Sequence, residues 1–179
     1  MLKYFETGDI LLISGNKPLA KTIQWFEEGK WNHSGMLLWI NDKLYVSESQ
    51  AKGICISPFT YYYFNITNQM GTLRLKTGIK PEIQSKIIDF ALPKSGHISY
   101  DYANLLVFQP IRYLSKKIFG KDLWLQPEHK APKRFVCSEW VAYIYNHFFG
   151  YFEDWQKISP QDLYNSTLFN FKPYKRELL

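Results

Sequence analysis

The chain has 179 residues, of which 46% are hydrophobic and 21% are charged, a balance that excludes a disordered or fibrous protein. Its length predicts a single domain over residues 1–179, because two separate cores would be cramped. The net charge of +6 favours anionic partners, but the lysines are scattered and no zinc-finger, RNP or P-loop spacing occurs, so no nucleic-acid partner is expected.

The sequence predicts neither a targeting segment nor a membrane span. Glu6 and Asp9 interrupt the apolar residues near the N-terminus, which is unlike a secretory signal. The longest clean apolar run, 36–40, is far too short to cross a bilayer. With only Cys55 and Cys137, a disulfide framework is not expected, and at least one thiol is free for chemistry. We therefore expect a cytoplasmic protein, unless a leader was removed.

The first part of the chain predicts a strand, a helix and a hairpin. Residues 10–13 form a short apolar strand. Residues 17–28 carry apolar side chains at helical spacing, and Gly29 fits the C′ position that ends a helix. Asn41-Asp42 suits the positive φ angles of a two-residue hairpin turn. The two strands that this turn joins are 33–40 and 43–49.

The second part of the chain alternates strands and helices. Pro110 must break or kink any helix that runs through it, and Gly150 ends the last predicted helix. The elements predicted here are strands at 54–59 and 72–76, helices at 80–92 and 138–149, an apolar helical stretch at 100–119 and a loop at 121–134.

The register of the hairpin brings two polar side chains together. If Asn41 and Asp42 are the only loop residues, Gly35 faces Glu48 and His33 faces Gln50. His33 and Glu48 then lie diagonally on one face of the sheet, about 7–8 Å apart in the backbone, with the small Gly35 between them. Either Glu48 or Gln50 can orient the imidazole of His33, whose other nitrogen is left to face a nucleophile.

Cys137 is the candidate nucleophile. It lies just before the first turn of the helix at 138–149, where unpaired N–H groups and the helix dipole favour a thiolate. Backbone N–H groups at the same place can stabilise an oxyanion. Taken singly, a free cysteine is more often a buried core residue, and a histidine at a strand start is more often packed or solvated.

The local sequence around these residues resembles the permuted NlpC/P60-like hydrolases, in particular the YiiX/YebB-like family. The matching segments are TGDILLISG, WNHSGMLL around His33, SESQAKGICISPF, SYDYANLL, FVCSEWVAYIY around Cys137, and SPQDLYNS. The resemblance implies Cys137 as the nucleophile, His33 as the general base and Glu48 as the third member. It also implies hydrolysis or transfer at amide or ester bonds of peptides, cell-wall fragments or lipids.

Several further residues are candidates for contacts with a substrate. Tyr100, in SYDY, resembles the family's tyrosine near the active site, although a core role is about equally expected. Gln50 shares the hairpin face of His33. Glu139 is a candidate contact for a cationic group, but helix capping is the stronger expectation. Trp31 is a candidate wall of the cleft, with packing as the default.

Other polar residues are assigned structural roles. Asp101 is expected to cap a helix, and Cys55 to lie in the core. The remaining histidines lack the spacing of metal ligands, so neither a metal nor an organic cofactor is predicted. These histidines are His97, His129 and His147.

The residues and the resemblance together predict an α+β, circularly permuted papain-like (NlpC/P60) fold, with a central antiparallel sheet packed against helices. The predicted function is a cysteine hydrolase that cleaves an amide or ester through a thiolate acyl-enzyme. Two alternatives stay open: an acyltransferase of the lecithin:retinol acyltransferase type, and a non-catalytic module that binds a peptide or amino acid. The expected partner is a small peptide-, cell-wall- or lipid-derived substrate, and the oligomeric state is left open.

Overall fold

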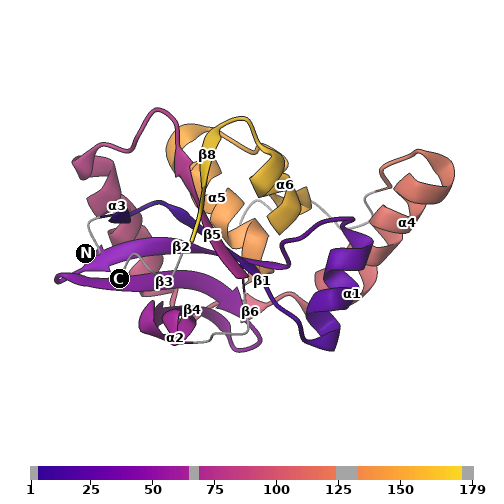
Figure 1. Cartoon of the computed structure of the whole chain (residues 1–179), viewed down its shortest axis with the longest axis horizontal. Helices are drawn as coiled ribbons and strands as arrows, with labels where there is room; N and C mark the ends of the chain where they lie inside the picture. The colour runs from indigo at the N-terminus through magenta and orange to yellow at the C-terminus, as the bar shows by residue number, and fades with distance from the viewer. Residues whose placement is uncertain (1–3, 65–68, 124–132, 175–179) are drawn as a thin grey trace.

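The computed structural model describes residues 4–64, 69–123 and 133–174. Its centre is a six-stranded antiparallel sheet with the strand order β4-β3-β2-β1-β5-β8 (Figure 1). The strands of this sheet are β1 (Ile10–Ser14), β2 (His33–Ile40), β3 (Lys43–Gln50), β4 (Gly53–Pro58), β5 (Gln69–Leu75) and β8 (Phe169–Pro173). A separate parallel pair is formed by β6 (Ser99–Tyr100) and β7 (Arg134–Phe135).

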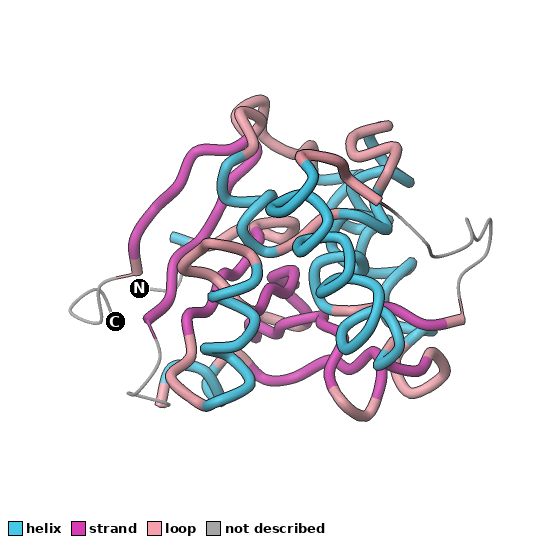
Figure 2. Tube along the Cα trace, turned by 90° about the vertical axis from the view of Figure 1, so that its right-hand side faces the viewer, coloured by secondary structure: helices cyan, strands magenta, loops and turns pink. Residues whose placement is uncertain are grey.

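Helices of different lengths accompany the sheet, and Figure 2 shows strands passing along two sides of a group of helices. The α-helices are α1 (Pro18–Phe26), α2 (Thr60–Tyr63), α3 (Pro81–Ala91), α4 (Gln109–Phe119), α5 (Cys137–Phe149) and α6 (Pro160–Asn165). Shorter helical turns are the 3₁₀ segments Leu92–Lys94 and Trp155–Lys157, and a π-helical segment, Asn104–Phe108, leads into α4.

The core is built around α5, which explains why that helix is so apolar in sequence. Its residues Trp140 and Tyr145 are fully buried in a cluster with side chains from β1, β2 and β5. Burial of such large side chains contributes most of the favourable free energy of folding. Two hydrogen bonds also fix α5 to the sheet side of the molecule. The Nε1–H of Trp140 donates to Ser47 Oγ at 3.0 Å, and the hydroxyl of Tyr145 donates to the Gly8 carbonyl at 2.7 Å.

The predicted hairpin and its register are confirmed. Asn41 and Asp42 have φ angles of 48° and 59°, and the paired residues run from Ile40 opposite Lys43 to Met36 opposite Ser47. The absence of a side chain at Gly35 is required here. A Cβ at that position would lie 2.4 Å from Val46 Cγ1 and 3.2 Å from Glu48 Cβ.

The helix α1 ends at Phe26 rather than at residue 28, and its C′ position lies one residue earlier than predicted. Glu28, with φ of 47°, takes the left-handed position, and the N–H of Gly29 bonds to the Gln24 carbonyl at 3.0 Å. This is the Schellman pattern, with glycine one position later than expected. Gly29 lies against the side chain of Gln161, and a Cβ there would lie 2.4 Å from Oε1 of Gln161, so a larger residue would displace that side chain. That oxygen also accepts a hydrogen bond from the N–H of Lys30 at 2.9 Å.

Other differences come from segments with weak sequence patterns. The π-helical turn directly precedes Pro110, where α-helical bonding is lost in any case because proline has no N–H. The prediction of a loop at 121–134 lies mostly outside the described residues, while Arg134 pairs in β7. Elements that the sequence did not predict are α2, α6, β6, β7 and β8.

Gly53, at the turn between β3 and β4, gives the first testable prediction. It has φ of +98°, and a Cβ there would lie 2.1 Å from the backbone oxygen of Ile98. We expect Gly53→Ala to lower the free energy of unfolding by about 3 kcal/mol, since both the clash and the left-handed backbone are unfavourable. Denaturant unfolding measures this loss.

The matched control for Gly53→Ala is Gly78→Ala. Gly78 has φ of +69° but nothing within 4 Å of its Cβ position, so only the backbone penalty of about 1 kcal/mol is expected. Equal losses in the two variants would contradict the close approach of Gly53 to Ile98.

Candidate active site

Cys137 is placed by the short strand β7 and the start of α5. Val136, which is extended at φ −84° and ψ 170°, is the N-cap residue, so Cys137 is the first residue of the helix. The strand before it is held by two contacts to the Phe135 carbonyl, from Ser49 Oγ at 2.7 Å and from the Asp101 N–H at 3.1 Å. The sulfur therefore lies at the positive end of the helix dipole.

His33, the first residue of β2, lies between Cys137 and Glu48. Its Nε2 is 2.6 Å from Oε2 of Glu48. This leaves Nδ1 to interact with Cys137, which lines the same cavity as His33. Oε2 of Glu48 also accepts a hydrogen bond from the Tyr62 hydroxyl. The amide of Gln50 donates to that same hydroxyl at 3.0 Å. These contacts fix the carboxylate, and through it the orientation of the imidazole.

The charges of these groups depend on one another. Burial by itself raises the pKa of Cys137, but His33 and the backbone N–H groups of Ser34 and Ser138 outweigh it, so that the pKa of the thiol is lowered. Burial by itself lowers the pKa of His33, yet Cys137 and Glu48 raise it well above its ordinary value. The arrangement therefore favours a thiolate beside an imidazolium at neutral pH.

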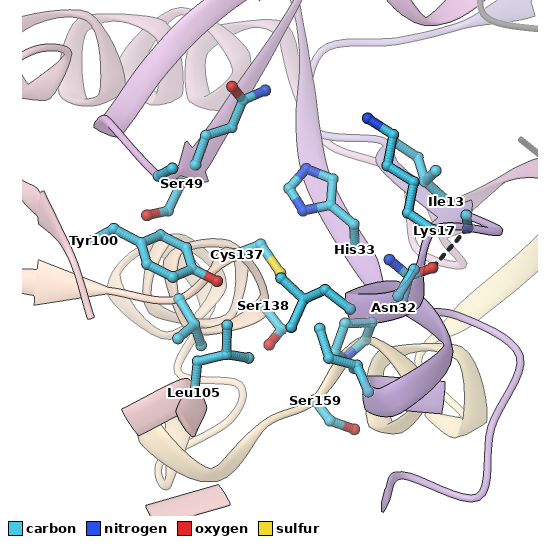
Figure 3. Close-up of a pocket in the computed structure, with 18 of the residues that line it drawn as sticks. Ile13, Lys17, Asn32, His33, Ser49, Tyr100, Leu105, Cys137, Ser138 and Ser159 are labelled. Atoms are coloured by element: carbon cyan, nitrogen blue, oxygen red, sulfur yellow. Dashed lines mark hydrogen bonds between the residues drawn. The ribbon is translucent and has the colours of Figure 1, made fainter. Parts of the chain in front are cut away.

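A cavity of about 410 Å³ opens beside the sulfur. Figure 3 shows the His33 ring and the Cys137 sulfur facing the same space, with the Tyr100 hydroxyl turned toward the sulfur from the other side. Burial and the nearby Cys137 raise the pKa of Tyr100, which keeps its hydroxyl protonated as a donor. The apolar and aromatic residues of the lining are Ile13, Leu19, Ala20, Ile23, Ala51, Tyr61, Tyr62, Tyr100, Tyr102, Leu105, Val136 and Pro160.

Comparison with known proteins identifies the fold and the family. Residues 4–167 match the family described as "Permuted papain-like amidase enzyme, YaeF/YiiX, C92 family". The chain belongs to this family. Among solved structures, it is similar to yiiX from Escherichia coli O157:H7, with a TM-score of 0.58 and 18% identity over 95% of this chain and 97% of that one. No curated protein matches.

Membership of the C92 amidase family confirms the predicted resemblance and the α+β, permuted papain-like fold. The histidine strand β2 precedes the cysteine helix α5 in sequence, as the permuted order implies. The family also makes a small amide the expected type of substrate. Among the described residues, no helix is both long enough and apolar enough to span a membrane.

The structure places two of the predicted substrate contacts at the cavity and two elsewhere. Tyr100 and Gln50 line it, whereas Glu139 and Trp31 do not. Glu139 is buried and accepts a hydrogen bond from the Val136 N–H at 2.7 Å, so it caps α5. Trp31 is buried against Tyr164 and Phe171. Each side chain thus has the role that the sequence made the stronger expectation, capping for Glu139 and packing for Trp31, and neither lines the cavity as a substrate contact.

The structural roles predicted for the other polar residues have mixed outcomes. Oδ1 of Asp101 accepts a hydrogen bond from the Asn104 N–H at 2.9 Å, as a helix cap does. Cys55 is only partly buried on β4, near Ser57, rather than in the core. His129 lies outside the described residues.

Three polar side chains of the site were missed in the sequence. Tyr62 lies on the four-residue helix α2, which is too short to show a periodic pattern. Gln24, on α1, donates to the Lys30 carbonyl at 2.8 Å and to Asn32 Oδ1 at 3.3 Å, which ties α1 to the segment before His33. Glu27 lines the cavity, and burial raises the pKa of its carboxyl well above the ordinary value. No local pattern in the sequence indicates these tertiary contacts.

The yiiX protein is a metalloprotein, and a metal site in this chain would need a cluster of donor side chains. Within residues 4–64, 69–123 and 133–174, no group of three or more His, Cys, Asp or Glu side chains is placed to hold a metal ion. A stable site usually needs three or four such protein ligands. The described residues therefore do not fit a metal centre, and no role for a metal follows from them.

Proposed function

We propose that this chain is a cysteine amidase in which Cys137 is the nucleophile, His33 the general base and acid, and Glu48 the group that orients His33. One observation carries the proposal: the imidazole of His33 lies between the thiol of Cys137 and the carboxylate of Glu48, with 2.6 Å between Nε2 and Oε2. A nucleophile, a base and an orienting acceptor in this order are what acyl transfer by a thiolate requires.

The proposed reaction begins when the Cys137 thiolate attacks the amide carbonyl carbon. The carbonyl oxygen gains negative charge. The Tyr100 hydroxyl and the N–H groups at the start of α5 can donate hydrogen bonds that stabilise this charge. The imidazolium of His33 gives its proton to the amine nitrogen as the C–N bond breaks. A water molecule then gives a proton back to His33 and attacks the thioester, which releases the carboxylic acid and restores the thiolate.

The lining of the cavity supports a small substrate with an apolar portion. Its volume of about 410 Å³ lies in the range of small-molecule sites, and such sites combine an apolar lining with a few polar groups. Here the polar groups include Asn32, Gln50 and Ser159. A small amide derived from a peptide, a cell-wall fragment or a lipid fits this description.

The experiment that tests the proposal is mass spectrometry of the protein after rapid mixing with a panel of activated amides and esters. We expect an adduct with the mass of the acyl group on Cys137, which disappears as the acid is released. Cys137→Ala is expected to form no adduct, whereas Cys55→Ala, the matched control at the other thiol, is expected to form it normally. An acid released equally by Cys137→Ala and the unmodified chain would refute the proposal.

The same experiment separates hydrolysis from transfer. With an added primary amine or alcohol, a hydrolase is expected to release mainly the free acid, whereas an acyltransferase would pass the acyl group to the acceptor. If Cys137 never forms an adduct and alkylates like an ordinary thiol, the binding-module alternative is favoured instead.

A further inference from the structure

The helix α4 and the π-helical segment before it have their apolar side outward. Val107, Ile111, Leu114 and Ile118 repeat at helical spacing, and all four are exposed. The opposite side of α4, which faces the protein, carries buried polar side chains, namely Gln109, Arg112 and Ser115. A surface helix of a globular protein normally has the reverse arrangement, with its apolar face on the core. Within residues 4–64, 69–123 and 133–174, the apolar face of α4 is therefore left without a packing partner.

This apolar face is large and continues onto α1. On α4 and the segment before it, Leu106 is 60%, Val107 48% and Ile118 66% exposed. On α1, Trp25 is 62% and Leu19 54% exposed. Scattered single apolar residues are ordinary on a protein surface, but exposed apolar side chains gathered on two neighbouring helices indicate an interaction site.

The two helices form one end of the molecule. Lys117 of α4 makes an ion pair with Glu28, just after α1, at 2.9 Å, and its ammonium lies 5.5 Å from the Trp25 ring centroid. Figure 1 shows α1 and α4 together at the end of the molecule opposite α3. We call the exposed apolar residues of this end the α1–α4 face; its members are Leu19, Trp25, Leu106, Val107, Ile111, Leu114 and Ile118.

The charges around the α1–α4 face are mainly positive. Residues 17–28 and 109–123 contain six basic and three acidic side chains. Glu28 is paired with Lys117, and Asp122 with Arg112. Lys21 and Lys116 are exposed and form no ion pair with any described residue. The charge left over at this end is therefore cationic.

We propose that the α1–α4 face docks on the surface of an anionic lipid bilayer. Apolar side chains with a tryptophan among them, bordered by lysines, are what an interfacial helix uses: the apolar groups enter the acyl boundary while the lysines contact anionic headgroups. The polar side of α4 already packs against the rest of the protein, so only its apolar side is free to contact a membrane. The net charge of +6 acts in the same direction.

The docking would set the position of the cavity. Leu19 of α1 and Tyr102, at the start of the helix that leads to α4, are exposed and also line the cavity beside Cys137. A bilayer in contact with the α1–α4 face therefore lies next to the cavity. The docking itself does not depend on the amidase reaction, so it can be tested without a substrate.

The test is co-sedimentation of the full chain with vesicles of phosphatidylcholine, with or without phosphatidylserine. We expect binding to the vesicles that contain phosphatidylserine, and weaker binding as salt is added. Ile118→Glu is expected to weaken this binding roughly tenfold, because it removes an inserted apolar side chain and adds a repelled charge. Leu92→Glu is the matched control: Leu92 is also exposed but follows α3, and its replacement is expected to leave binding unchanged.

Several results would overturn the inference. Failure of the unmodified chain to sediment would do so, as would equal binding to vesicles without phosphatidylserine or an equal effect of Ile118→Glu and Leu92→Glu. Light scattering on a sizing column measures whether the chain forms a dimer instead. A dimer that Ile118→Glu dissociates, without binding to vesicles, would assign the α1–α4 face to a second copy of the chain. Both variants change exposed side chains, and circular dichroism checks that they fold.

Discussion

Replacement of His33 with alanine is expected to return the thiol of Cys137 toward its ordinary pKa and to lower kcat/KM by about 10³-fold. The interaction with His33 is the strongest influence that lowers the pKa of this buried thiol. Without it, burial raises the pKa, and little thiolate is left at neutral pH. The proton donor for the leaving amine is lost at the same time, so nucleophile and acid fail together.

The pH dependence of alkylation by iodoacetamide measures the first part of this effect. The experiment is best done in a Cys55→Ala background, so that Cys137 is the only thiol. In the parent chain, alkylation is expected to begin at a pH below the ordinary range of a thiol, because the pKa of Cys137 is lowered. In His33→Ala it is expected to begin at a higher pH. His97→Ala, which replaces an exposed histidine on the loop before β6, is the control.

The rate of amide hydrolysis is expected to follow a bell-shaped curve with pH. The acid limb reflects deprotonation of Cys137, whose pKa is lowered, and the alkaline limb reflects loss of the proton of His33, whose pKa is raised. Because the two pKa values are moved apart in the productive order, the plateau includes neutral pH. An alkylation profile that is the same in the parent chain and in His33→Ala would contradict the coupling of the two residues.

The sequence predicted those parts of the site that depend on local rules. Asn41-Asp42 determines the turn, the turn determines the register, and the register places His33 near Glu48. The position of Cys137 at a helix start follows in the same way from the apolar run after it and from Gly150. These predictions depend only on residues that are close in sequence, so the sequence alone is sufficient for them.

The parts that the sequence did not predict depend on contacts between distant segments. Trp31 is buried because Tyr164 and Phe171, from α6 and β8, pack on it, and neither element had a clear pattern in the sequence. Tyr62 reaches Glu48 only because the sheet and α2 fold together. The outward direction of the apolar side of α4 could not be predicted either, since the helical period of apolar residues does not say which side faces the core.

The carboxylate of Glu48 gives the second large prediction. Glu48 is fully buried, and its Oε2 meets both His33 Nε2 and the Tyr62 hydroxyl. We expect Glu48→Gln to lower kcat/KM by about 10²-fold or more, because a neutral amide cannot stabilise the imidazolium and can present its NH₂ group to the ring nitrogen. Tyr62→Phe, which removes one donor to the same oxygen and keeps the charge, is expected to cost about tenfold.

The stability of these variants separates a role in catalysis from a role in folding. Burial by itself raises the pKa of Glu48, but His33 and Tyr62 outweigh it and lower the pKa. A carboxyl with a lowered pKa in the folded state adds stability above its unfolded pKa and loses it as the pH falls through the folded pKa. The melting temperature of the parent chain is therefore expected to decrease as the pH falls below about 4. The melting temperature of Glu48→Gln is expected to depend less on pH in this range. If Glu48→Gln unfolds like the parent at every pH and keeps full activity, the carboxylate neither orients nor charges His33, and the thiolate must be maintained by the start of α5 alone.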